Sequence, residues 1–192
     1  NISSDIAQLR QAGADLVITS FHWGTKFEEE PSSAQRNLAQ YTLEAGADII
    51  MGTGSHVAQP VTVKTITIDG QEKKVVVMYS LGNFFADQVA DNNYITQAGF
   101  ICNIDISRNE ETQQVEIGEV TYIPTYINRW TQVNTTDNST VFNYRVLPSA
   151  PYSEAAECPK TFADENAWNL CKNAYKHIKE VLNKLKLYTE DN

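Results

Sequence analysis

Two stretches decide the fold, LVITSFHWG at residues 16–24 and DIIMGTGSHVAQP at residues 48–60. Each is a short apolar run that leads into glycines and a histidine, and a helical pattern from Ser33 to Ala45 lies between them. Strand signals that alternate with helix signals are typical of βαβ units with parallel strands and a right-handed crossover. Because LVITSF is apolar on both faces, we expect it to form an internal strand of the sheet.

The chain changes character after Pro60, where longer extended segments follow one another. VTVKTITI (61–68) and KKVVVMYS (73–80) flank Asp69-Gly70, which is a strong signal for a β-hairpin. GFICNIDIS (99–107) and QVEIGEVTYIP (114–124) form a second such pair. The sequence therefore predicts a mixed α/β fold, in which antiparallel strands continue or cover a parallel sheet.

The last third of the chain divides into two parts. Residues 128–162 are rich in Asn, Thr, Ser and Pro and are interpreted as a loop-rich extension, mostly surface loop with one possible strand at 141–146. Residues 163–187 predict an amphipathic helix that packs on the same domain, although partner binding is an alternative. Its apolar stripe consists of Trp168, Cys171, Tyr175, Ile178, Leu182 and Leu185. We expect His177, beside the stripe, to be solvated.

Composition limits the function classes. The 192 residues carry a net charge of -9, which argues against capture of nucleic acid or of an anionic membrane surface. No apolar run reaches the roughly 20 residues that span a bilayer, and the first residues lack an export signal. We expect an incomplete piece of an extracytoplasmic protein, at the cell surface or anchored in the membrane through a segment outside this chain.

Three cysteines leave at least one thiol without an intramolecular partner. We expect Cys102 to be a buried apolar residue of its strand. Whether Cys158 and Cys171 form a disulfide stays open, because that bond requires an oxidising compartment.

The chemistry is expected where the strands end. In open α/β sheets, ligands bind outside the carboxyl ends of parallel strands, and His22 and His56 occupy two equivalent places there. Imidazole can bind a metal or transfer a proton near neutral pH, and nearby glycines let the backbone approach a ligand. A shared metal or phosphate site and simple packed or surface histidines are both compatible with this spacing. A third strand end carries Gly82-Asn83, which a turn alone would also explain.

Several short blocks follow one another along the chain: His22-Trp23-Gly24, Pro31, Gln35, Ala45-Gly46-Ala47-Asp48, Gly52, His56-Val57, Gln59-Pro60 and Tyr79-Ser80-Leu81-Gly82-Asn83-Phe84. In this order and spacing they resemble the bacterial capsule synthesis proteins of the CapA/PgsA type, over roughly residues 1–125. The resemblance implies a role in poly-γ-glutamate capsule biosynthesis or export and a fold similar to calcineurin-like metallophosphatases. Residues 1–127 would form the C-terminal half of that β sandwich, flanked by helices, and the missing N-terminal half would supply the other metal ligands.

The resemblance also implies a site. His22 and His56 would be the catalytic and metal-binding residues, with a divalent metal such as Mn, Fe or Zn. The ligand-binding residues would be Trp23, Gly24, Lys26, Gly54, Ser55, Gln59 and Asn83. The implied partners are an anionic polymer or phosphorylated intermediate, the missing half of the fold and other capsule synthase subunits at the membrane.

Three positions depart from the family pattern. Gly54 stands where the family usually has another histidine, Ser55 where it has a proline, and Lys26 where it commonly has a glutamate. A dinuclear centre would lose a ligand, and a cation at Lys26 would oppose a metal and favour an anionic ligand. Three hypotheses follow: a capsule component with a metallophosphatase-like cleft, a degenerate non-catalytic binding or scaffold domain, and a phosphoesterase unrelated to capsules.

Overall fold

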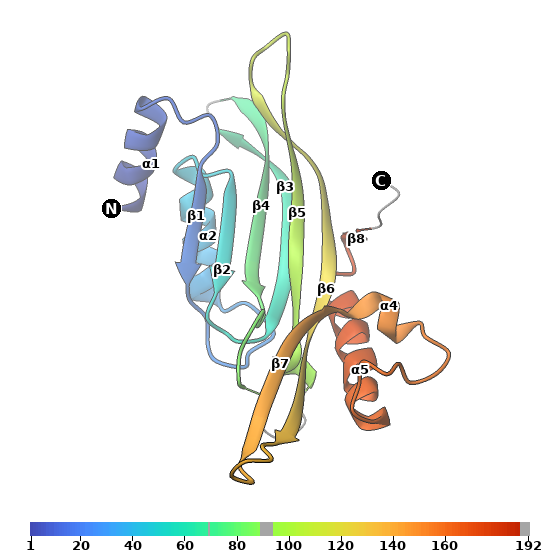
Figure 1. Ribbon diagram of the computed structural model, residues 1–192. Coiled ribbons are helices and arrows are strands. Elements are labelled where there is room, and N and C mark those ends of the chain that lie inside the picture. Colours follow the sequence, from blue (N-terminus) through green and yellow to red (C-terminus); the bar gives the residue numbers. More distant parts are fainter. Residues whose placement is uncertain (69, 89–93, 189–192) are drawn as a thin grey trace.

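The computed structural model describes residues 1–68, 70–88 and 94–188 and contains two four-stranded sheets (Figure 1). The first sheet has the order β1-β2-β4-β3, in which β1, β2 and β4 are parallel and β3 is antiparallel to β4. Its strands are β1 (Ile18–His22), β2 (Ile49–Thr53), β3 (Ala58–Ile68) and β4 (Gln71–Leu81). The second sheet consists of β5 (Ala98–Arg108), β6 (Val115–Val133), β7 (Thr140–Pro148) and β8 (Lys186–Leu187). The predicted mixed α/β fold is confirmed.

The helices begin at side chains that cap their free backbone amides. Helix α2 has a capping box, in which Ser32 Oγ accepts from the Gln35 amide at 3.2 Å and Gln35 Oε1 accepts from the Ser32 amide at 3.0 Å. Asn1 caps α1, and Asp164 caps α5 through the Ala167 amide at 2.8 Å. The helices are α1 (Ile2–Gln11), α2 (Ser33–Glu44), α3 (Tyr94–Gln97), α4 (Ser149–Ser153) and α5 (Glu165–Val181).

Both faces of the first sheet are covered, because successive residues of a strand point to opposite sides. On one side Ile50, Val75 and Val77 pack with Ala39 and Leu43 of α2. The other side joins the largest core cluster, which also contains side chains of the second sheet and of α5. The sheet is thereby fixed between a helix and a second sheet, and its strand ends are held in place.

The predicted C-terminal amphipathic helix is confirmed over Glu165–Val181, where Cys171, Ala174 and Ile178 are fully buried, but it ends before residue 187, because Lys186 and Leu187 form β8. The expectation that His177 is solvated is wrong. Its ring is only 9% exposed and meets Tyr94 edge-on, with the ring centroids 6.0 Å apart. The short helix α3 covers this side of α5, a contact between segments far apart in the sequence that the helical pattern could not reveal.

The expectation of an internal strand at LVITSF is also wrong. In the described sheet β1 is an edge strand, and Ile18 is 55% exposed. Val17, just before the strand, is buried in a small cluster with Ile6 and Ala47. The apolar character of this run therefore reflects packing at its start rather than neighbours on both sides.

The interpretation of residues 128–162 as mostly surface loop is wrong for their first part, whereas the possible strand at 141–146 is confirmed by β7. Strand β6 continues to Val133 and pairs with β7 from Thr125↔Pro148 to Val133↔Thr140. This hairpin projects beyond the sandwich (Figure 1), so solvent reaches both of its faces and polar residues are tolerated there.

The predicted turn residue Asp69 lies outside the described residues, but the hairpin around it is present, with Ile68 opposite Gln71. Of the three cysteines, Cys102, Cys158 and Cys171, each is a free thiol, so the disulfide left open above is not formed. Burial raises the pKa of Cys171 to about 12 and that of Cys102 to about 11. Within the described ranges, no helix has the length and apolarity to span a membrane.

Truncation of the core should show that α5 is part of the same folding unit. Ile178→Ala removes a fully buried side chain, and we expect it to lower the free energy of unfolding by about 2 to 5 kcal/mol. Leu9→Ala is the control, because Leu9 is exposed and such changes stay within about 0.5 kcal/mol. Urea unfolding followed by circular dichroism measures both, and equal small effects would contradict the packing of α5.

Candidate functional site

The parallel strands bring three loops to one edge of the first sheet. β1, β2 and β4 run in the same direction, so their carboxyl ends lie together, and the following loops carry His22, His56 and Asn83. His22 closes β1 directly opposite Thr53, and its Nδ1 lies 3.5 Å from Thr53 Oγ1. The sequence correctly placed these residues at the carboxyl edge, where ligands bind in open α/β sheets.

Asn83 orients the ring of His56. Its Oδ1 lies 3.1 Å from His56 Nδ1, while its Nδ2 donates to the Thr96 carbonyl at 2.9 Å and to Gln88 Oε1 at 3.3 Å. Because an amide oxygen only accepts, Nδ1 of His56 must carry the proton of this hydrogen bond. In the neutral ring Nε2 is then left with its lone pair, so it can accept a proton or bind an electrophile.

His56 itself and the nearby Phe27 adopt positive φ, a backbone conformation that residues other than glycine rarely take. His56 has φ 61° and Phe27 has φ 68°, and the Phe27 amide donates to the Ser55 carbonyl at 2.7 Å. The rings of Phe27 and His56 lie 6.4 Å apart, and Lys26 Nζ lies 5.0 Å from the Phe27 ring. Left-handed conformations cost on the order of 1 to 3 kcal/mol each and gather at functional sites, so this strain marks the loops as a candidate site.

Two predicted ligand-binding residues are instead part of the scaffold under these loops. Gln59 is fully buried, accepts from Gln35 Nε2 at 2.8 Å and donates to the Glu28 carbonyl at 2.8 Å. Ser55 is also fully buried and donates to the Val57 carbonyl at 2.9 Å. Since their hydrogen-bonding groups are occupied, both side chains hold the loops in position and do not face a ligand.

The side chain of Trp23 reaches from the end of β1 to β4. Its Nε1 donates to the Tyr79 carbonyl at 2.8 Å, and its ring stacks on Phe21 with centroids 4.8 Å apart. The Trp23 backbone lies so close to Gly54 that a Cβ there would be 2.4 Å from the Trp23 carbonyl oxygen, and Gly54 has φ 123°. The histidine that the family usually carries at this position therefore does not fit this backbone.

The neighbouring positions complete the edge. Gly24 has φ 87° and packs against the Gln35 side chain, which explains a glycine there without a ligand. Lys26, like His22, is exposed and reaches solvent at the edge. Among the predicted site residues, His22, Lys26 and half-buried His56 thus remain accessible to a ligand.

The described residues do not complete a metal site. Nowhere in the described ranges do three or more His, Cys, Asp or Glu side chains come together closely enough to hold a metal ion. His22 and His56 have separate partners, Thr53 and Asn83, and together they offer two nitrogens where a zinc site uses at least three protein ligands. A shared metal centre stays a prediction that requires ligands from elsewhere.

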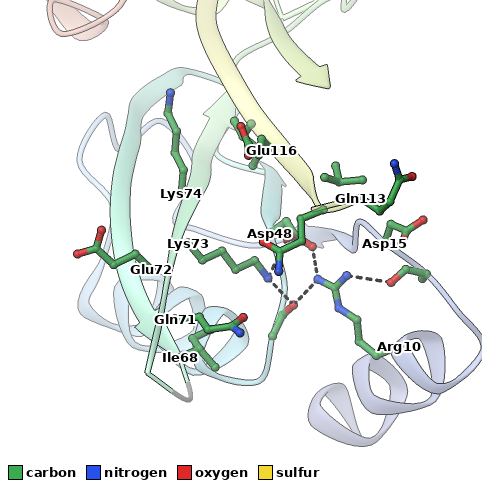
Figure 2. A pocket seen from close by; sticks show the side chains of 15 residues that line it. Arg10, Asp15, Asp48, Ile68, Gln71, Glu72, Lys73, Lys74, Gln113 and Glu116 are labelled. Atoms are coloured by element: carbon green, nitrogen blue, oxygen red, sulfur yellow. Dashed lines mark hydrogen bonds and ion pairs between the residues drawn. The ribbon is translucent and has the colours of Figure 1, made fainter. Parts of the chain in front are cut away.

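A pocket of about 690 Å³ lies at the opposite end of the sheet, at the amino ends of β1, β2 and β4 (Figure 2). Buried Asp48 accepts from the Val17 amide at 2.6 Å and pairs with Lys73 at 2.8 Å and with Arg10. Arg10 also donates to the Ala14 and Gly46 carbonyls. These charges are used to join α1 to the sheet, so the pocket is a structural junction rather than the candidate site.

Some residues of the edge were not found from the sequence. Thr53 and Phe27 contact the predicted site residues, and Arg129 and Tyr144 of the β6–β7 hairpin contact the loop that follows Asn83. In the run VFNYRV (141–146) Phe142 and Tyr144 alternate with other residues, which could have indicated a strand with one aromatic face.

The geometry defines a mixed α/β domain with His22 and His56 at the carboxyl ends of its parallel strands. Comparison with known proteins shows what part of the chain is similar to. Residues 1–88 match the family described as "Bacterial capsule synthesis protein PGA_cap". This part of the chain is thus similar to the bacterial capsule synthesis family, and the resemblance seen in the sequence is confirmed.

Two curated relatives agree with this assignment. The "PGA biosynthesis protein CapA" of Bacillus subtilis (strain 168) is 43% identical over 75 residues, which is 39% of this chain and 18% of that protein. The "Capsule biosynthesis protein CapA" of Bacillus anthracis is 40% identical over 79 residues, which is 41% of this chain and 17% of that protein. The matched part of the chain thus spans less than a fifth of the length of either relative.

Substitution of Gly54 tests the close approach of the Trp23 backbone. Gly13 also has positive φ, 93°, but has open space around it, so Gly13→Ala reports the conformational cost alone, about 1 to 2 kcal/mol. We expect Gly54→Ala to lower the free energy of unfolding by at least about 1 kcal/mol more, because the added methyl group overlaps backbone. Chemical unfolding of both variants is the measurement, and equal costs would show that the edge has room for a side chain.

Proposed function

We propose that this chain acts in the biosynthesis or export of a capsular polymer of the poly-γ-glutamate type, through the loops that carry His22, His56 and Asn83. One observation carries the proposal: the segment related to the capsule proteins, residues 1–88, contains all three of these loops. The curated relatives carry names that refer to PGA or capsule biosynthesis.

The chemistry of the edge suits an anionic group. His56 presents Nε2 from a ring held by Asn83, His22 is exposed at the end of β1, and Lys26 adds a cation. When Nε2 takes up a proton, the imidazolium ring donates to a carboxylate or phosphate through a charge-assisted hydrogen bond, as the ammonium group of Lys26 does. We therefore propose that the edge holds a carboxylate of the polymer or the phosphate of an intermediate.

A second candidate is a non-catalytic binding or scaffold domain. The lack of room at Gly54 favours it, because the family's usual histidine cannot occupy this position. A metal-dependent phosphoesterase, in contrast, needs ligands in addition to His22 and His56, such as those of the implied N-terminal half. In either case we propose that further capsule synthase subunits at the cell surface complete the working assembly.

Substitution in cells tests the proposed function. We expect His56→Ala and His22→Ala, introduced into the native protein, to reduce polymer production by at least about tenfold, comparable to the loss of one positioned catalytic or binding group. The measurement is the mass of cell-bound and released polymer at equal protein level. Arg108→Gln, an exposed change at the far end of the second sheet, is the control.

Two outcomes are informative about mechanism. Asn83→Ala should reproduce the His56 defect in part, because it frees the ring without removing it. Unchanged polymer production in both histidine variants would contradict the proposal, whatever the stability of the domain.

A further inference from the structure

Exposed aromatic rings gather where the loop after β4 meets the β6–β7 hairpin. Phe84 and Phe85 are 57% and 65% exposed, and Phe142 on the hairpin is 48% exposed. The Phe85 ring contacts Tyr144 edge-on, with centroids 6.0 Å apart. We call Phe84, Phe85, Arg129, Phe142 and Tyr144 the aromatic–arginine platform.

Arg129 gives the platform a positive charge in an acidic chain. Its guanidinium carbon lies 4.1 Å from the centroid of Phe142 and 5.9 Å from that of Tyr144. Its Nε, though buried, makes no hydrogen bond among the described residues, and it forms a long ion pair with Asp87, whose Oδ1 lies 3.9 Å away. The second arginine of the hairpin, Arg145, stacks on Trp130 on its other face, so Arg129 is the cation of the platform, in a chain whose net charge is -9.

The platform is continuous with the candidate site. Phe84 follows Asn83 directly, and Tyr144 donates a hydrogen bond to Asp87 of the same loop, so the loop is fixed between His56 and the hairpin. The hairpin projects past the carboxyl ends of β1 and β4 (Figure 1). His22 ends β1 and His56 follows β2, so the histidines belong to the same end of the first sheet. A polymer segment that is bound at the histidines can therefore extend across these rings.

We propose that the aromatic–arginine platform binds an extended segment of an anionic polyamide, the polymer class of the proposed function on which this inference rests. Planar amide groups stack on aromatic faces, and Arg129 meets a carboxylate with donors that the rings already orient. The rings supply contact area at low entropic cost because each has only two rotatable side-chain bonds. The platform then acts as a polymer-binding subsite beside His56 and Asn83.

Direct binding tests the subsite. The purified chain is titrated with poly-γ-glutamate of defined length in isothermal calorimetry, with its neutral methyl ester as the uncharged comparison. Arg129→Gln should weaken binding by at least about tenfold, and Phe85→Ala by about three- to tenfold. Tyr41→Ala and Arg108→Gln are the controls, because they remove an exposed ring and an exposed guanidinium elsewhere. Circular dichroism checks that each variant is folded.

Asp87→Asn separates binding from loop support. If Arg129 serves the polymer, removal of the nearby carboxylate should leave binding unchanged or make it tighter. If Arg129 and Asp87 only hold the loop, both substitutions should weaken binding alike, which would overturn the proposal. Binding of the methyl ester as tight as that of the polyanion, or unchanged affinity in Arg129→Gln and Phe85→Ala, would also overturn it.

The binding experiment on the platform and the cell experiment on the proposed function can fail independently of each other. Loss of polymer production in the His56→Ala cells together with unchanged binding by Arg129→Gln would remove the platform and keep the proposed function. No binding of the polymer by the wild-type chain would overturn the platform by itself, since the cell experiment does not depend on it.

Discussion

The side-chain amide of Asn83 is the interaction on which the candidate site depends. It accepts from His56 on one side and donates to Thr96 and Gln88 on the other, and it is itself only 8% exposed. The amide thus joins the loop after β2 to the chain that leads into the second sheet. A buried amide with three partners has little freedom, so the imidazole that it orients is presented in one direction.

The two ends of the first sheet have different roles. At the amino ends, Asp48 forms ion pairs with Arg10 and Lys73 and accepts a hydrogen bond from the Val17 amide. These interactions form a charged junction between α1 and the sheet. At the carboxyl ends, His56 and Phe27 adopt strained backbone conformations, and the nearby aromatic rings remain exposed. The interactions that stabilise the sheet lie at its amino end, and the groups that remain free to contact a ligand lie at its carboxyl end. Proteins that bind ligands at strand ends usually have this arrangement.

Much of the fold could be predicted because its signals are local. The helix of α2, the strand β2 and both hairpin pairs of β3–β6 follow from periodicity and turn residues over short windows. Properties set by distant neighbours could not be predicted in this way. Ile18 is exposed because no described strand pairs with its free edge, and His177 is buried because α3 lies against it.

The candidate site was predictable to a similar extent. Its histidines stand at strand ends and can be read from the sequence, whereas the burial of Gln59 and Ser55 depends on loops that fold back over them. The contact of Phe85 with Tyr144 joins residues 59 positions apart, and no local pattern signals it.

Hydrogen exchange, followed by mass spectrometry with and without poly-γ-glutamate, tests most directly whether the carboxyl-end loops form the binding surface. We predict that the polymer slows exchange in the segments around His56, Phe85 and Tyr144 and leaves the junction around Asp48 and Lys73 unchanged. Protection of that junction instead, or no protection anywhere in the chain, would contradict binding at the carboxyl-end loops.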